Sequence, residues 1–228
     1  MNEKSASYQK HVIIDLEFTS VPKKFAAQRE IIKFETIQIG AVLLDRNYRK
    51  ISTFSTYVKP EFACHIKPSV SKLTGITDKD LVNAPSFAEA MEKLVAWIGE
   101  GEKIRIYSWS KTDLYQMQGE CRIKSVEFPT CMSRRWMDFQ SVYGRLISTR
   151  QKLSLKNAVV SANGQFLGTQ AHTALYDAMA TAELLILTRD KEAFLQKTRT
   201  VRELLAPPKA FGSTIGEMYG AQLAKFLT

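Results

Sequence analysis

The sequence has few of the residues that define several protein classes. Only three of its 228 residues are cysteines, Cys64, Cys121 and Cys131, and no two of them have Cys-x-x-Cys spacing. An odd number of cysteines without that spacing argues against a disulfide framework and against a structural zinc site. We therefore expect reduced thiols and a cytoplasmic location.

Long apolar runs and low-complexity segments are also missing. No stretch provides the roughly 20 apolar residues of a membrane-spanning helix, and no signal-peptide pattern opens the chain. A length of 228 residues allows one substantial domain and is short for two. We expect one domain without membrane association, preceded by a loose polar leader at 1–10. A C-terminal helical extension at 191–228 is expected to dock on this domain.

Acidic residues are fewer than basic ones. The chain has 32 Lys and Arg against 23 Asp and Glu, a formal net charge of +9. Such a charge attracts polyanions through long-range electrostatics and counterion release. The densest basic stretch runs from Arg134 to Lys156 and includes Arg135, Arg145, Arg150 and Lys152. It is compatible with a solvated helical face and with a surface that follows a nucleic-acid backbone.

The segment His11–Thr19 is an apolar run that ends in two carboxylates, Asp15 and Glu17. Side chains two residues apart on a strand share a face, so both acids can project into one small volume. Like charges held that close repel unless a cation neutralises them. An isolated Asp-x-Glu also occurs in solvated turns, so other acids are needed before chemistry is inferred.

The order of the expected elements indicates the fold class. Turn-forming residues at 45–48 separate two strands with β-branched and aromatic residues, which predicts an antiparallel meander of the first three strands. Strands and helices then alternate, which predicts an α/β fold with a mixed sheet. The expected strands are 11–19, 34–44, 51–58 and 103–107, with a further short strand within 128–137.

Helices are expected from caps and apolar spacing. Ser86 and Glu89 have capping-box spacing before a helix to Ile98. A short helix is expected to be capped by Ser69, and a helix over 113–121 by Ser110 or Thr112. One helix from Asp138 should face inward with Phe139, Val142 and Leu146, and a long one through Leu187 should have an apolar stripe of Leu175, Met179, Ala182, Leu185 and Ile186. The remaining expected helices are 153–160, a helical stretch at 192–205 and a closing helix at 215–226.

Two further acids can reach the end of the first strand. Asp113 begins a helix directly after the fourth strand, and Asp177 lies in the first turns of the long helix that follows His172. Four carboxylates would be strongly destabilised as bare charges, but they form a suitable oxygen cage for Mg²⁺ or Mn²⁺. Two such ions about 3.5 to 4 Å apart can activate water and stabilise a departing alkoxide in phosphodiester cleavage.

These motifs resemble the DEDD superfamily of 3′-to-5′ exonucleases, which includes ribonuclease T and the proofreading subunit of bacterial DNA polymerase III. The resemblance covers about residues 11–190, which we expect to form the exonuclease domain. The branch is DEDDh, because its histidine lies five residues before the last Asp, as His172 does; the tyrosine branch would need Tyr where this chain has Thr173. Further similar segments follow in the family's order at 34–42, 73–77 and 154–158.

The resemblance implies a ribonuclease H-like mixed sheet flanked by helices and a two-metal-ion hydrolase. By this similarity, two Mg²⁺ or Mn²⁺ ions are bound by four carboxylates, and His172 deprotonates the attacking water. Nucleoside 5′-monophosphates are released from single-stranded 3′ ends of RNA or DNA. The implied metal ligands are Asp15, Glu17, Asp113 and Asp177.

Four more residues occupy positions where related enzymes approach the substrate. Phe18 and Thr19 follow the first motif, Leu73 matches an apolar residue near the terminal base, and Trp109 resembles an aromatic residue that stacks on a base in the eukaryotic-type exoribonuclease branch. Core packing is the alternative role for Trp109 and Phe18. The similarities at Leu73 and Trp109 favour RNA over DNA.

Two other functions are compatible with the resemblance. The chain could be a proofreading partner of a polymerase, with the closing helix at 215–226 as a docking element for that partner or for a second copy of the chain. It could also be a noncatalytic nucleic-acid-binding module, but the complete set of acids and His172 argues against this.

Overall fold

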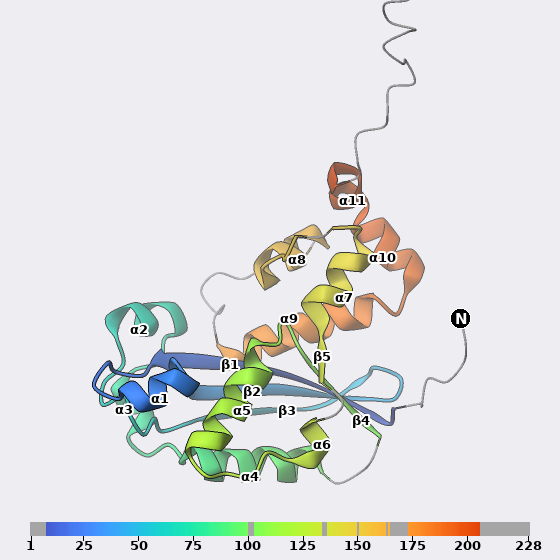
Figure 1. The fold of residues 1–228 in the computed structure, drawn as a ribbon. Coiled ribbons are helices and arrows are strands. Elements are labelled where there is room, and N and C mark those ends of the chain that lie inside the picture. Colours follow the sequence, from blue (N-terminus) through green and yellow to red (C-terminus); the bar gives the residue numbers. More distant parts are fainter. Residues whose placement is uncertain are drawn as a thin grey trace, which may run out of the picture.

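The structure is a computed structural model, and it describes residues 8–99, 103–133, 136–149, 151–162, 164 and 173–205. Five strands form one mixed sheet in the order β3-β2-β1-β4-β5 (Figure 1). The first three pair antiparallel, and β4 and β5 add in parallel on the other side of β1. The strands are β1 (Lys10–Ser20), β2 (Phe34–Asp45), β3 (Lys50–Tyr57), β4 (Ile104–Ser108) and β5 (Trp136–Asp138).

The predicted meander is confirmed, and a tight turn closes it between β2 and β3. The carboxylate of Asp45 accepts hydrogen bonds from the amides of Asn47 and Arg49 at 2.7 and 2.8 Å. Tyr48 has a positive φ of 63° in this turn. A turn this short forces β3 to run back along β2, which is why these two strands pair antiparallel.

β1 lies in the middle of the sheet, and its side chains alternate between two apolar cores. Val12, Ile14 and Leu16 belong to the core on one face, whereas Ile13 belongs to the core on the other. Asp15 and Glu17 continue the row of Ile13. Helices α4 (Phe87–Ile98) and α5 (Thr112–Ile123) cover the first face, and α7 (Phe139–Leu146), α8 (Leu155–Ser161) and α9 (Ala174–Leu187) cover the second (Figure 1).

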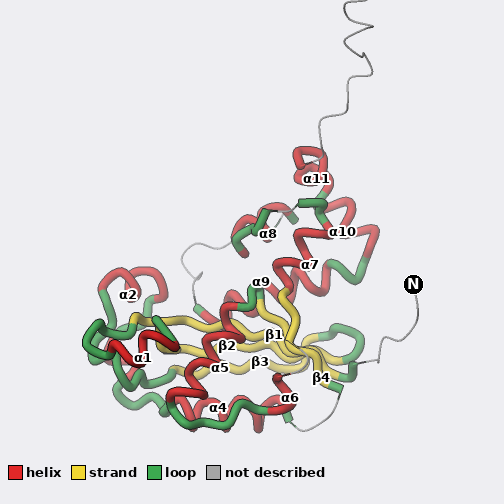
Figure 2. The backbone as a smooth tube through the Cα atoms, in the orientation of Figure 1, coloured by secondary structure: helices red, strands yellow, loops and turns green. Residues whose placement is uncertain are grey.

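Short helices connect these elements and extend the chain beyond α9. Phe194 of α10 is buried in the same core as α7 and α9. The predicted helical stretch at 192–205 is thus two helices, whereas the predicted closing helix at 215–226 lies outside the described residues. Within the part of the chain that is described, no helix is long and apolar enough to span a bilayer. The short helices are α1 (Ala26–Ile31), α2 (Pro68–Thr74), α3 (Asp78–Leu81), α6 (Thr130–Ser133), α10 (Lys191–Lys197) and α11 (Arg199–Leu205) (Figure 2).

Three helix starts were predicted from caps; the cap of α4 is confirmed, that of α2 is wrong and that of α5 is partly as expected. The capping box of α4 is present, because the Glu89 carboxylate accepts a hydrogen bond from the Ser86 amide and the Ser86 hydroxyl accepts one from the Glu89 amide. Ser69 does not cap α2; the helix starts one residue earlier at Pro68, whose fixed φ suits the first helical position. α5 starts at Thr112, whose amide donates to the hydroxyl of Ser110 at 3.2 Å, while Lys111 at the N-cap position contributes no side-chain bond.

The buried faces of α7 and α9 differ from the predicted stripes. In α7, Tyr143 is fully buried, with its hydroxyl bonded to Ser161 and to the Ala158 carbonyl, and Leu146 is 42% exposed. In α9, Ala182 and Leu185 of the predicted stripe are buried, whereas Ile186 is 38% exposed. The helix also buries small side chains that were not in the predicted stripe, because its start lies very close to the sheet. The buried residues of α9 are Ala174, Ala178, Ala180, Thr181, Ala182, Leu184 and Leu185.

Candidate active site

Three carboxylates meet on the face of the sheet that α9 covers. Asp15 and Glu17 extend from β1, and Asp177 extends from the first turn of α9. One oxygen of each lies within 4.8 Å of the others. All three side chains are half-buried. Among the described residues this is the one group of His, Cys, Asp or Glu that is close enough to share a metal ion.

The fourth predicted acid, Asp113, lies beside this group but is not part of it. It is 6% exposed and sits in the first turn of α5. Its carboxylate accepts a hydrogen bond from the backbone amide of Leu16. That amide is available because β1 pairs with β4 only as far as Ile13. Asp113 therefore takes the place of the missing strand partner next to Asp15.

Burial and mutual repulsion raise the pKa of these acids. The pKa of Asp15 is well above its usual value, first through burial and then through the charges of Asp113, Asp177 and Glu17. Burial, followed by the charges of Asp177 and Asp113, raises the pKa of Glu17 to about 8. Burial raises the pKa of Asp113 to about 7, although two backbone hydrogen bonds oppose it. Over the described residues, no lysine or arginine forms an ion pair with Asp15, Glu17 or Asp113.

The geometry and chemistry of the group fit a divalent cation. Carboxylate oxygens are the ligands that Mg²⁺ and Mn²⁺ prefer. A bound cation would lower the cost of holding several buried negative charges together, since it neutralises the repulsion that raises their pKa values. Asp15, Glu17 and Asp177 are therefore suited to hold a metal ion.

The predicted substrate-binding residues differ in their exposure. Leu73 is 54% exposed in the last turn of α2. Phe18 is half-buried against the α4 core, with its ring centroid 6.4 Å from that of Phe34. Thr19 is 1% exposed, and its hydroxyl has no hydrogen-bond partner among the described residues. Of these residues, Leu73 offers the largest surface to a substrate.

Trp109 is placed in the core. It is 8% exposed, its indole N–H donates to the Leu153 carbonyl at 3.1 Å, and its ring packs against Phe139 and Tyr143. A ring enclosed in this way leaves little of its face for a base, so its surroundings favour the core-packing alternative. His172, the expected general base, lies outside the described residues.

Two residues of β2 complete the surroundings of the carboxylates; both lie in the segment 34–42 that resembles the family, but no role at the site was predicted for either of them. Gln38 accepts a hydrogen bond from the amide of Ala174 at 3.0 Å, and Gly40 lies directly under the start of α9. A glycine in a strand interior often marks the close approach of another backbone. A glycine in the interior of a strand, between Ile39 and Ala41, was the available signal.

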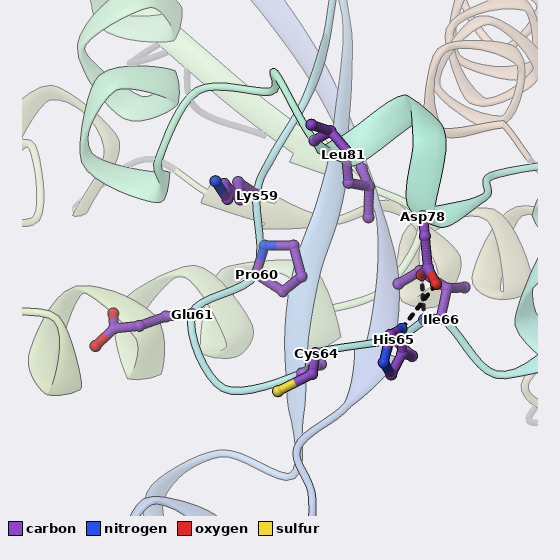
Figure 3. Close-up of a pocket in the computed structure, with 10 residues that line it drawn as sticks. Lys59, Pro60, Glu61, Cys64, His65, Ile66, Asp78 and Leu81 are labelled. Atoms are coloured by element: carbon purple, nitrogen blue, oxygen red, sulfur yellow. Dashed lines mark hydrogen bonds and ion pairs between the residues drawn. The ribbon is translucent and has the colours of Figure 1, made fainter.

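A separate pocket of about 380 Å³ lies along the loop before α2 (Figure 3). His65 and Asp78, which both line it, form an exposed pair at 3.0 Å on one side of the pocket, and the Asp78 carboxylate also accepts a hydrogen bond from the Ile66 amide. These contacts explain the position of His65 in the loop before α2 without a catalytic role. The pocket contains none of the four predicted metal ligands, so it is not part of the acidic site.

The sheet order and the acids on its central strand define a ribonuclease H-like nuclease fold. The model of the RNase T-type exonuclease family matches residues 12–185, and the chain belongs to this exonuclease family. The nuclease domain of 3′hExo, a DEDDh family member solved with bound rAMP, has the same fold with a TM-score of 0.69. That comparison covers 81% of this chain and 94% of the other, at 22% sequence identity.

Two relatives show how far the similarity extends. ERI1 exoribonuclease 2 of Danio rerio is 26% identical over 197 residues, which cover 76% of this chain. The chain spans only 34% of the length of that relative. The DNA polymerase III subunit epsilon of Aquifex aeolicus is 27% identical over 178 residues, covering 77% of this chain and 78% of the relative.

Proposed function

We propose that this exonuclease removes nucleoside 5′-monophosphates one at a time from the 3′ end of single-stranded RNA, with two Mg²⁺ or Mn²⁺ ions as cofactors. The observation that carries the proposal is the approach of Asp15, Glu17 and Asp177 within 4.8 Å, with Asp113 beside them. Acids held this close suit metal-assisted hydrolysis of a phosphodiester.

Each residue of the site has a distinct role in this proposal. Asp15, Glu17 and Asp177 would hold one ion, and Asp15 and Asp113 would hold the second. The ions supply an activated water and charge stabilisation at the departing oxygen. His172 takes the proton from the water; an unperturbed imidazole, with a pKa of about 6.5, is mostly neutral above pH 7 and can accept it.

Exposed basic residues near the site support a nucleic-acid substrate. The segment 21–34 follows the end of β1 and contains one acid, Glu30, while the segment 66–77, which includes α2, contains none. α1 and α2 lie at the end of the sheet where β1 finishes (Figure 1). Backbone phosphates are attracted to such a surface whatever the base sequence. The exposed basic residues of these two segments are Lys23, Lys24, Lys33, Lys67 and Lys72.

RNA is the preferred substrate in this proposal for two reasons. The Danio rerio relative is named an exoribonuclease, and the 3′hExo nuclease domain was solved with a ribonucleotide. Leu73, in the segment that resembles the exoribonuclease branch, is exposed and can pack against a terminal base. The biological RNA is not specified by these residues, because contacts to backbone and base faces tolerate any sequence.

A direct comparison of end-labelled substrates tests the proposal. RNA and DNA of one sequence, each labelled at the 5′ end, are incubated with the protein and Mn²⁺. We expect the RNA to shorten in steps of one nucleotide, faster than the DNA, with 5′-monophosphates as products. Loss of the 5′ label as the first product, or no cleavage of either substrate by folded protein, would contradict it.

Proofreading for a polymerase is the second candidate, supported by the similarity to the Aquifex aeolicus subunit. A proofreading exonuclease degrades DNA, and it removes a mismatched 3′ end faster than a paired one. The same assay with a primer–template separates the two functions. DNA degraded at least as fast as RNA, with preference for a mismatched primer end, would favour proofreading.

A further inference from the structure

The first turn of α9 rests on two residues of β2, Gln38 and Gly40. We propose that these two residues are positioning residues for the metal centre: they fix the start of α9 and thereby set the distance of Asp177 from Asp15 and Glu17. The inference rests on the proposed function, because it assigns a purpose to the spacing of the proposed metal ligands. Neither residue touches the metal or the substrate in this proposal.

The strand register places both residues next to the acids. Gly40 pairs with Asp15, and Gln38 pairs with Glu17. Paired residues on neighbouring antiparallel strands have their side chains on the same face of the sheet. Gln38 and Gly40 therefore face α9, as the two acids do. The pairing becomes irregular directly after Glu17, so these are the last two regular same-face pairs before the bulge.

Gly40 allows the backbone of α9 to approach the sheet directly. A Cβ atom at this position would overlap the backbone carbon of Ala174 and the backbone nitrogen of Leu175, well inside the 3.0 Å that real Cβ atoms keep. Both of the overlapped atoms belong to the main chain, so no side-chain rotation can relieve the clash. Any side chain at position 40 must push the first turn of α9 away from β2.

Gln38 fixes the same turn by a hydrogen bond. The first amides of a helix have no partner within the helix. Ala174 is the first residue of α9, and its amide donates to the side-chain oxygen of Gln38 at 3.0 Å. Gln38 is 6% exposed, so water is a poor substitute for this bond. The Thr173 hydroxyl accepts from the Tyr176 amide at 3.3 Å and completes the cap.

Asp177 moves with this turn, because it lies three residues after Ala174 in the same helix. Metal–ligand distances in a functional site are held within about 0.2 Å. A displacement of the turn by the size of a methyl group is several times larger than that tolerance. The contact at Gly40 and the bond from Gln38 therefore control whether Asp177 can share an ion with Asp15 and Glu17.

Gly40→Ala is the stronger test, and Gly144→Ala is its matched control. Gly144 is also buried, but a Cβ there would lie 3.4 Å from its nearest neighbour, the Thr149 carbonyl oxygen, and far less crowding results. Mn²⁺ affinity is measured by calorimetry on metal-free protein, alongside the midpoint of thermal unfolding without metal. We expect Gly40→Ala to weaken Mn²⁺ binding about 10- to 100-fold, the range found when residues that orient metal ligands are changed. Gly144→Ala is expected to bind Mn²⁺ like the wild type.

Gln38→Met removes the hydrogen bond with little change in volume, and Gln140→Met is its control. The side-chain amide of Gln140, on α7 and away from the acids, donates to the Leu153 carbonyl, so the control removes a comparable bond. We expect Gln38→Met to bind Mn²⁺ more weakly than Gln140→Met at a similar unfolding midpoint. This milder variant decides the question if Gly40→Ala does not fold.

Wild-type Mn²⁺ affinity in folded Gly40→Ala, or equal affinities in Gln38→Met and Gln140→Met, would overturn the positioning role alone. A wild-type chain that binds no Mn²⁺ would overturn the proposed function, and the positioning role with it. The two failures are therefore distinguishable by the wild-type titration.

Discussion

Asp15 is the residue on which the other three acids of the site act. Burial and the charges of Asp113, Asp177 and Glu17 all raise its pKa. A protein gains nothing in stability from such an arrangement, since each carboxylate would be better solvated alone. At the scale of single residues, the group of acids is therefore best explained as a cation-binding site. Without the cation, the repulsion between the acids lowers the stability of the folded protein.

The metal-free protein is expected to lose stability as the pH rises from about 4.5 to about 8. The folded-state pKa values of Glu17 and Asp113 are raised to about 8 and about 7, above those of an unfolded chain. The folded state then binds more protons than the unfolded state across this window, so the free energy of unfolding falls with increasing pH. Thermal unfolding with a chelator tests this. Mn²⁺ should reduce the decline, and so should Asp15→Asn; a stability that rises over this window would contradict the electrostatic account.

His172 is a prediction from the DEDDh resemblance. If it is the general base, His172→Ala should lower the rate of RNA cleavage about 100- to 10,000-fold and leave Mn²⁺ binding close to that of the wild type. Cleavage rates and calorimetry measure the two effects. His65→Ala is a suitable control, because this exposed histidine pairs with Asp78 outside the acidic site. An unchanged rate in His172→Ala would remove it from the mechanism.

At the scale of the elements, features that depend on residues close in sequence were predicted better than features that depend on packing between distant segments. The turn at 45–48, the capping box of α4 and the alternation in β1 depend on residues close in sequence, and all three predictions are confirmed. The predicted apolar stripe of α9 was wrong at Ile186, and it missed the small buried residues at the start of the helix, whose close approach to the sheet depends on Gly40 of β2. Trp109 similarly packs against residues of α7 that no local pattern connects to it.

The helix that carries Asp113 is fixed by a buried polar network that was not predicted from the sequence. Glu120 of α5 is fully buried and accepts hydrogen bonds from the amide and the hydroxyl of Thr36. Lys124 lies between Glu120 and Glu35, at 2.7 and 3.1 Å from their carboxylates. These partners are up to 89 residues apart, so only the folded chain brings them together.

Lys124→Met is expected to destabilise the protein by about 3 to 5 kcal/mol, because it leaves two buried carboxylates without their common cation. The free energy of unfolding in urea measures this. Lys156→Met, a change at an exposed position of α8, should cost much less. Equal costs for the two variants would show that the Lys124 network contributes no more than an exposed lysine.

At the scale of the whole molecule, the fold class and the approach of Asp15, Glu17 and Asp177 could be predicted from the sequence, whereas the location of the proposed RNA-binding surface could not. The motif order identifies the exonuclease family, and the family model matches residues 12–185. The boundaries proposed for the leader and the C-terminal extension stay predictions. The sequence alone does not decide which basic surface would contact the RNA, because basic residues occur both near the end of β1 and in the stretch 134–156.

The basic residues of the α2 segment are expected to contact the RNA backbone. The double change Lys67→Gln and Lys72→Gln should weaken binding of single-stranded RNA, measured without divalent metal. It should also reduce the salt slope by about 0.7 for each phosphate that is no longer neutralised. Lys152→Gln with Lys156→Gln is the matched control, since these exposed lysines lie near α8. A larger effect in the control pair would place the RNA on the other basic stretch.

The position of bound Mn²⁺ tests the central claim most directly. Crystals grown with Mn²⁺ and a nucleoside 5′-monophosphate would show the ions by anomalous scattering. We expect two ions roughly 3.5 to 4 Å apart, one of them bound by Asp15, Glu17 and Asp177 and the other contacting Asp15. Mn²⁺ found only away from these carboxylates, with the nucleotide elsewhere on the surface, would contradict the account.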